Sequence, residues 1–186
     1  MKKTLIAWLL AVAACTARAE DLDKARLLVA TPQLQGFYGR TALLVVPMHG
    51  RHIGFILNRA TELKLGALFP EHAPSAKVVE PLYFGGPEMS EAIFALVRRD
   101  PGQSAMALFG DVFVTGSAQT VDRIIEHTPN DARYFAGFVG WQPGELEKEI
   151  QSGFWYVADP DASVVFSKDT PALWEALVMR FRQGYI

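Results

Sequence analysis

The stretch RYFAGFVGWQPGELEKEIQSG, residues 133–153, indicates how the rest of the chain is organised. Its first eight residues are largely apolar at both alternating sets of positions, which is typical of a strand buried on both faces. Pro143 suits the first position of a helix, because its missing N–H group would have no partner there. Leu146 and Ile150 then share one helical face. We therefore expect a central strand, a sharp turn and a short acidic helix.

The predicted helix carries two carboxylates on one face, Glu145 and Glu149, while Glu147 points elsewhere. Two carboxylates at this spacing suit acid–base catalysis or the binding of a divalent cation. A carboxylate near a helix N-terminus is also stabilised by the helix dipole, by about 0.3–1 kcal/mol, without any function. We favour a capping or solvated role for both residues, with catalysis as the alternative.

Shorter patterns predict the other elements. Helices are expected at 62–69, capped by Thr61, from Ser117 to the residue before Pro129, and from Thr170 onward. No strict strand–helix repeat appears, so we expect an α+β fold: one domain, from Leu22 to the end, on a mixed, largely antiparallel β-sheet with short flanking helices. Apolar runs between turn residues predict strands at 26–32, 41–47, 52–57, 81–87, 92–97, 106–109, 112–114, 154–157 and 164–166.

The N-terminus has the order of an export signal. Lys2 and Lys3 precede an apolar run from Leu5 to Ala14, and the small residues of Ala17-Arg18-Ala19 suit signal peptidase. The run is too short for a stable membrane anchor. We expect cleavage after Ala19 and a periplasmic location for the mature chain.

A lipoprotein signal, residues 1–14, is the alternative. Val12-Ala13-Ala14-Cys15 is similar to a bacterial lipobox, in which the cysteine is acylated, and Cys15 is the single cysteine of the chain. In that case the protein is held at the membrane by its lipid. With either signal the exported domain contains no cysteine, which excludes disulfides and thiolate chemistry there.

Charge argues against nucleic acid as a partner. Removing residues 1–19, which include Lys2, Lys3 and Arg18, lowers the formal net charge of −2 by three, to −5. An acidic domain lacks the basic surface that phosphate backbones require. The partner is expected to be an unidentified protein or small molecule.

Three further patterns are weak indicators of chemistry. His49 and His52 lie in an expected hairpin turn without a third ligand nearby, so we expect no metal site. The segment 85–87 is glycine-rich, but no Lys-Ser/Thr pair follows it, which favours a structural turn over a phosphate cradle. Ser117 is favoured as a helix cap over a nucleophile. We expect no cofactor.

Motifs along nearly the whole mature chain resemble the YqgE/AlgH family. They are LLVATP at 27–32, Arg40-Thr41, GFILNR at 54–59, YFGGP at 83–87 and, above all, GWQPGELEKEI at 140–150. The resemblance implies a single α+β domain on a mixed sheet and gives no catalytic residues. The motif positions that it identifies as structural are Asn58, Gly85, Gly86, Pro87, Gly140, Trp141, Gly144, Leu146, Glu147 and Glu149.

The chain departs from the family pattern in three ways. Members usually have Gln where Glu145 stands and Pro where Ala60 stands, and they usually lack an export signal. Some members are labelled transcriptional regulators, a role that an exported protein cannot fill on DNA.

Three functions are therefore weighed. The preferred one is an exported, non-catalytic binding or accessory domain. The second is a hydrolase or metal-dependent enzyme that uses Glu145, Glu149, Asn58 or the histidines, which would have to converge in one pocket. The third is a regulator, which requires a cytoplasmic location.

Overall fold

The structure, a computed structural model, describes residues 21–185. The predicted signal peptide and Cys15 lie outside these residues. The described strands form one sheet in the order β6-β7-β5-β8-β3-β2-β1-β9, with β4 placed separately beside β8. The strands are β1 (Arg26–Ala30), β2 (Ala42–Met48), β3 (Arg51–Ile56), β4 (Tyr83–Phe84), β5 (Glu88–Arg98), β6 (Met106–Phe109), β7 (Val112–Thr115), β8 (Ala132–Trp141) and β9 (Trp155–Ala158).

Short helices flank this sheet. They are α1 (Leu65–Leu68), α2 (Ala118–His127), α3 (Glu145–Gln151), α4 (Ala162–Val165) and α5 (Leu173–Arg182), with 3₁₀ helices η1 (Gly36–Tyr38) and η2 (Ala73–Lys77). Among the described strands only β4 and β8 pair in parallel. The predicted α+β fold on a largely antiparallel sheet is confirmed. No helix in residues 21–185 is long and apolar enough to span a bilayer.

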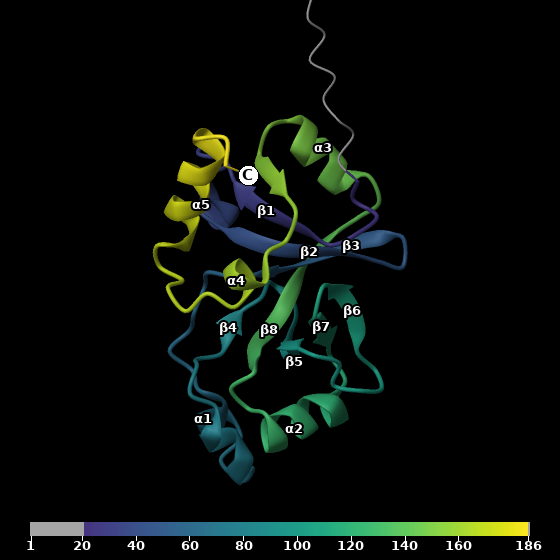
Figure 1. The fold of residues 1–186 in the computed structure, drawn as a ribbon, viewed down its shortest axis with the longest axis vertical. Coiled ribbons are helices and arrows are strands. Elements are labelled where there is room, and N and C mark those ends of the chain that lie inside the picture. Colours follow the sequence, from purple (N-terminus) through teal and green to yellow (C-terminus); the bar gives the residue numbers. More distant parts are fainter. Residues whose placement is uncertain (1–20, 186) are drawn as a thin grey trace, which may run out of the picture.

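Strand β8 is the centre of the sheet, as its two apolar faces predicted. Phe135 and Ala136 pair with β5 along one edge and with β4 along the other. The last residues, from Val139 to Trp141, pair with β3. β8 therefore joins an upper part of the molecule, with β1 to β3, α3 and α5, to a lower part with β4 to β7, α1 and α2 (Figure 1).

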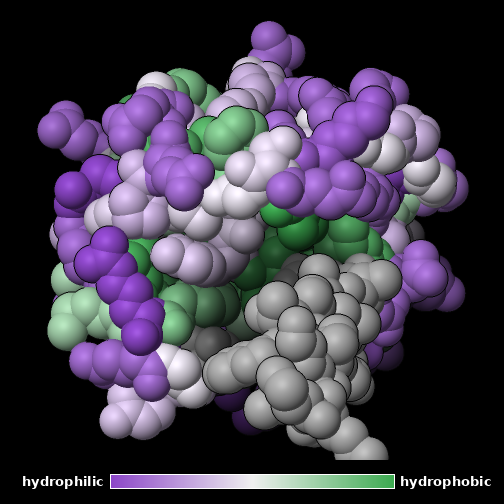
Figure 2. Space-filling model, turned by 90° about the horizontal axis from the view of Figure 1, so that it is seen from above, coloured by the Kyte–Doolittle hydropathy of each residue, from purple (hydrophilic) through white to green (hydrophobic). Residues whose placement is uncertain are grey.

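Each part has its own core, and a shared core joins them. Leu44, Phe55 and Phe135 belong to the shared core, while the core under α2 contains Val121 and Ile124. The third core surrounds Trp141 and Leu146, which are 3% and 0% exposed. Seen from the end that carries α3 and α5, hydrophobic surface gathers in a hollow between hydrophilic rims (Figure 2).

Two predicted elements were wrong. The apolar run 164–166 is not a strand but belongs mainly to α4, because the Asp161 carboxylate accepts a hydrogen bond from the Ser163 N–H (2.7 Å) and starts a helix. The predicted strand 81–87 is reduced to β4. Three apolar residues are too few for periodicity to separate strand from helix.

The predicted helix caps were also partly wrong. Ser117 is the N-cap residue of α2, but its side chain forms no capping hydrogen bond; its carbonyl accepts from the Thr120 N–H (3.0 Å) instead. Helix α1 begins after Lys64, and the Thr61 hydroxyl donates to the Leu82 carbonyl (2.6 Å).

The turn between β8 and α3 differs from the prediction in its register. Pro143 does not occupy the first helical position, because Gly144 follows it in a left-handed conformation (φ +79°) and is the N-cap. The Glu145 carboxylate accepts a hydrogen bond from the Gln142 N–H (2.8 Å) across this turn. The helix therefore starts two residues later than expected.

Glycines let the chain between β4 and β5 cross β8 at close range. An added Cβ at Gly85 or Gly86 would collide with the backbone of Gly137 or Phe138. Pro87 follows this crossing and immediately precedes β5. The glycine-rich segment therefore serves the approach of two backbone segments.

Gly137 and Gly140 are the matching positions on β8. Gly137 has φ +65°, and an added Cβ there would meet the carbonyl oxygen of Glu88. A Cβ on Gly140 would overlap the Glu88 carboxylate and Arg51, which form an ion pair (3.0 Å) directly over it. Both glycines leave room for β5 to start against β8.

Candidate functional site

The residues of the acidic helix are held by structural hydrogen bonds. One oxygen of Glu149 accepts from the indole N–H groups of both Trp141 (2.9 Å) and Trp155 (2.7 Å). Both tryptophans are buried, at 3% and 6% exposure. Glu149 thus ties α3 to β8 and β9, while Glu145 holds the turn that precedes α3.

Asn58 has a similar role at the end of β3. Its side-chain oxygen accepts from the Ala42 N–H (3.0 Å), and its amide donates to the Arg40 carbonyl (2.9 Å). Glu147 is half-buried, and one of its oxygens has no hydrogen-bond partner in the described chain. Asn58, Glu145 and Glu149 line neither of the cavities described below.

The histidines are spread over the molecule. His49 lies in the β2–β3 turn with φ +50°, and a ring nitrogen of His52 contacts the Leu22 carbonyl (3.1 Å). Within residues 21–185 no three His, Cys, Asp or Glu side chains form a group that could hold a metal ion.

Tyr38 adds a polar group near the family motif that sequence reasoning did not identify. Burial raises the pKa of the Tyr38 hydroxyl, and the nearby Glu149 carboxylate raises it further. The Arg59 guanidinium lies over the Phe37 ring, 4.4 Å from the ring centre. Burial lowers the pKa of Arg59. Among the motif residues, the polar side-chain atoms of Asn58 and Glu149 therefore already have hydrogen-bond partners within the fold.

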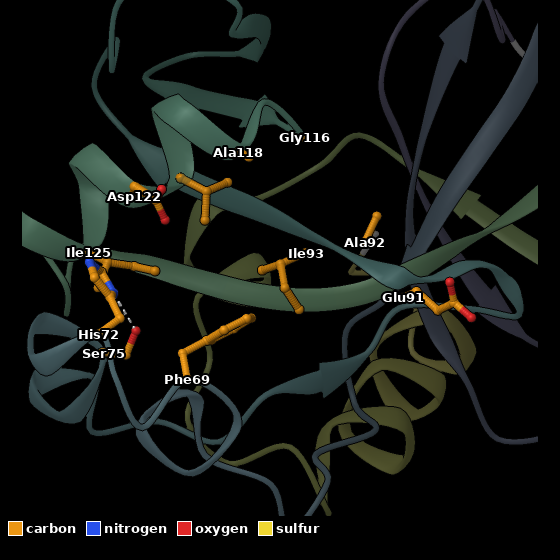
Figure 3. A pocket seen from close by; sticks show the side chains of 11 residues that line it. Phe69, His72, Ser75, Glu91, Ala92, Ile93, Gly116, Ala118, Asp122 and Ile125 are labelled. Carbon is orange, nitrogen blue, oxygen red and sulfur yellow. Dashed lines mark hydrogen bonds between the residues drawn. The ribbon is translucent and has the colours of Figure 1, made fainter.

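A groove at the opposite end of the molecule has the form of a binding site. It lies between α2, the α1–η2 segment and β5, and has a volume of about 530 Å³ (Figure 3). Ligand sites in proteins typically have volumes of roughly 300–1,000 Å³. The lining residues are Phe69, His72, Ser75, Glu91, Ala92, Ile93, Gly116, Ala118, Val121, Asp122 and Ile125.

The groove is apolar inside and acidic at its edges. Phe69 and Ile93 face the cavity from opposite elements (Figure 3), and Phe69 is 44% exposed although it is a large aromatic residue. Glu91 and Asp122 are its two carboxylates, and neither Lys nor Arg lines it. Such a groove favours an apolar ligand that carries positive charge.

An unpaired stretch of sheet edge borders the groove. β5 pairs with β7 only between Ala95 and Arg98, because β7 ends at Thr115 and the chain turns into α2. Along that edge, residues 91–94 have no strand partner in the described part of the chain. Ala92 and Ile93 of this stretch line the groove. An unpaired edge can accept the backbone of an extended peptide.

A His–Ser pair forms one wall of the groove. A ring nitrogen of His72 contacts the Ser75 hydroxyl at 2.8 Å (Figure 3). Ser75 is 0% exposed, so its hydroxyl is closed to a substrate and the contact braces η2. Neither residue was singled out from the sequence, although a spacing of three within one helical turn is compatible with such a contact.

Comparisons with known proteins agree with the fold. The family described as AlgH-like matches residues 27–185. A UPF0301 protein of Chlorobium limicola is 32% identical over 167 residues, which are 85% of this chain and 88% of the relative. A UPF0301 protein of Thermobifida fusca is 32% identical over 169 residues, 83% of this chain and 84% of the relative.

Two solved structures are similar in fold. A crystal structure of a Corynebacterium diphtheriae protein matches with a TM-score of 0.72 and 22% identity, over 88% of this chain and 89% of that protein. The solution structure of the AlgH protein from Pseudomonas aeruginosa matches with a TM-score of 0.70 and 22% identity, over 90% and 92% of the two chains. At this identity the similarity shows the fold alone.

Proposed function

The chain belongs to the AlgH-like family, and we propose that it is an exported, non-catalytic domain that binds an extended segment of another protein. The groove beside the unpaired stretch of β5 is the single observation that carries this proposal. An apolar interior accepts the alternate side chains of an extended peptide, and the free edge accepts its backbone.

The carboxylates at the groove indicate which kind of peptide segment it binds. Glu91 and Asp122 border the groove without a neighbouring Lys or Arg in its lining. A Lys or Arg flanking the apolar side chains would place its positive charge near these carboxylates. The partner is therefore a segment with alternating apolar residues and basic flanks.

Binding of two matched peptides by the mature chain tests this function. We expect a fluorescent peptide of alternating Val and Leu with Lys at both ends to bind, and the same peptide with Glu at both ends to bind at least about tenfold more weakly, a difference of about 1.4 kcal/mol. Fluorescence polarisation measures both affinities.

Variants on the exposed face of α2 separate groove binding from general attraction to an acidic protein. Asp122→Lys and Glu126→Lys change the net charge equally, but only Asp122 lines the groove. Asp122→Lys should abolish the preference for the Lys peptide, Glu126→Lys should retain it, and Ala118→Trp should block both peptides by filling the cavity. Equal binding of both peptides, absence of binding, or equal effects of the two Lys variants would refute the proposal.

Export is the second part of the proposed function and has its own test. We expect intact-mass analysis of the protein from its own host to give a chain that begins at Glu20. An acylated chain that begins at Cys15 would still support export, but the exported domain would then be anchored to the membrane by its lipid. An unprocessed chain of 186 residues would contradict export.

Regulation of transcription is not proposed. The mature chain would carry a formal net charge of −5, and neither Lys nor Arg lines the groove.

A further inference from the structure

A second cavity lies outside the peptide groove, at the end of the sheet where β5 ends and β8 begins. It has a volume of about 340 Å³, and charged or polar side chains make up most of its lining. We propose that this cavity binds a small oxyanion of the phosphate class.

Arg133 is the buried residue of the cavity lining, with an exposed fraction of 2%. Its terminal nitrogens donate to the carbonyls of Leu57 (2.8 Å) and Val165. The Arg133 Nε is buried and has no hydrogen-bond partner in the described chain. The nearest carboxylate oxygen, on Glu80, lies 3.8 Å from this Nε, which is close enough for an ion pair but beyond hydrogen-bonding distance. A buried donor without an acceptor is unfavourable, and an anion bound beside Arg133 would compensate the positive charge of this guanidinium.

The orientation of Arg133 is fixed before any ligand binds. Its guanidinium lies 3.9 Å from the centre of the Tyr83 ring, in addition to its two carbonyl contacts. A planar guanidinium held in this way is suited to oxyanion recognition, because little conformational freedom is lost on binding.

Two other cations that border the cavity, unlike Arg133, have no ion pair among residues 21–185. Arg99 and Lys168 are both exposed, whereas the third, Arg98, lies 3.8 Å from the Asp111 carboxylate. The Arg99 backbone N–H donates to the Asp111 carbonyl (2.7 Å), which fixes this residue at the cavity. The four cations exceed the three carboxylates by one positive charge, in a chain that is acidic as a whole.

The carboxylates limit the ligand to a small one. Glu80 is held beside Arg133 by the Tyr83 hydroxyl (3.2 Å), and Asp111 is occupied by Arg98. Asp131 is the third carboxylate and has no ion pair in the described chain. A compact dianion between Arg99 and Lys168 meets two positive charges that have no carboxylate partner, with the Arg133 guanidinium behind them, while an extended polyanion would also meet Asp131.

Calorimetric titration of the mature chain with inorganic phosphate, at constant ionic strength, tests this inference. Arg99→Asn together with Lys168→Gln removes two cations of the cavity, and Asn tolerates the left-handed conformation of Arg99 (φ +70°). Lys64→Ala together with Lys148→Ala removes two exposed cations elsewhere and is the matched control.

We expect saturable one-to-one binding of phosphate to the wild-type chain and to the control, and affinity at least about tenfold lower in the cavity variant. Glycerol phosphate in a parallel titration distinguishes a free ion from a phosphate group on a larger molecule: binding of both identifies a phosphomonoester site, and binding of inorganic phosphate alone identifies a site for the free ion. Absence of saturable heat with both probes, or equal affinity in the two double variants, would overturn the inference. Peptide binding in the groove does not depend on these residues, so the two proposals fail separately.

Discussion

Gly137→Ala is expected to destabilise the protein by roughly 2–5 kcal/mol, the sum of left-handed strain of about 1–2 kcal/mol and overpacking of about 1–3 kcal/mol. Gly137 has φ +65°, a region that side chains disfavour. Its added Cβ would also collide with the carbonyl oxygens of Gly86 and Glu88. This loss is a large part of the total stability of a domain, which is about 5–15 kcal/mol.

Chemical denaturation followed by tryptophan fluorescence measures the change, and Gly153→Ala is the matched control. Gly153 has a similar φ of +76°, but its Cβ would enter open space. The control should therefore lose only the conformational part, about 1–2 kcal/mol. Equal losses in the two variants would mean that the close crossing at Gly137 does not contribute to stability.

The crossing at Gly137 shows what the sequence could and could not predict about the fold. The apolar alternation of residues 133–140 predicted β8 and its burial on both faces, because that pattern is local. The partners of β8 could not be predicted, since β3, β4 and β5 reach it through contacts distant in sequence. The glycines at 85 and 86 indicated a tight turn, but only the folded chain reveals that Gly137 is the backbone they approach.

The groove was beyond sequence reasoning for a related reason. Val121 and Ile125 lie in the helix that was expected from Ser117 onward, and both also belong to the core under α2. Phe69 and Ile93 come from other elements, and nothing in their local patterns indicates that they face one another across a cavity. Apolar residues recur at the same spacing along a helix or strand whether they line a groove or fill a core, so the sequence pattern does not separate the two. The unpaired edge of β5 likewise depends on where β7 ends.

The acidic helix was the most prominent candidate in the sequence, and its variants give the second large effect. Glu149→Ala is expected to cost roughly 2–4 kcal/mol, because it leaves two buried indole donors without an acceptor. The donors belong to Trp141 and Trp155, whose rings lie edge to face with centres 6.5 Å apart. The change therefore loosens α3 from both β8 and β9.

Glu149→Gln provides the matched comparison, since its amide oxygen can still accept from the indoles but without the negative charge. We expect it to cost about 1 kcal/mol, the difference between a charged and a neutral acceptor. Lys148→Ala, an exposed neighbour on α3, should change stability by less than about 0.5 kcal/mol. Denaturation monitored by tryptophan fluorescence is informative here because the two indoles themselves lose their partner.

The order of the three variants distinguishes a structural carboxylate from a functional one. If Glu149 is retained for its contacts to Trp141 and Trp155, stability must fall most in Glu149→Ala, less in Glu149→Gln and least in Lys148→Ala. A carboxylate kept for chemistry at the expense of stability would give unchanged or increased stability on replacement. That result would return the helix at 145–151 to consideration as an active site, with Tyr38, whose pKa burial and Glu149 raise, as its neighbour.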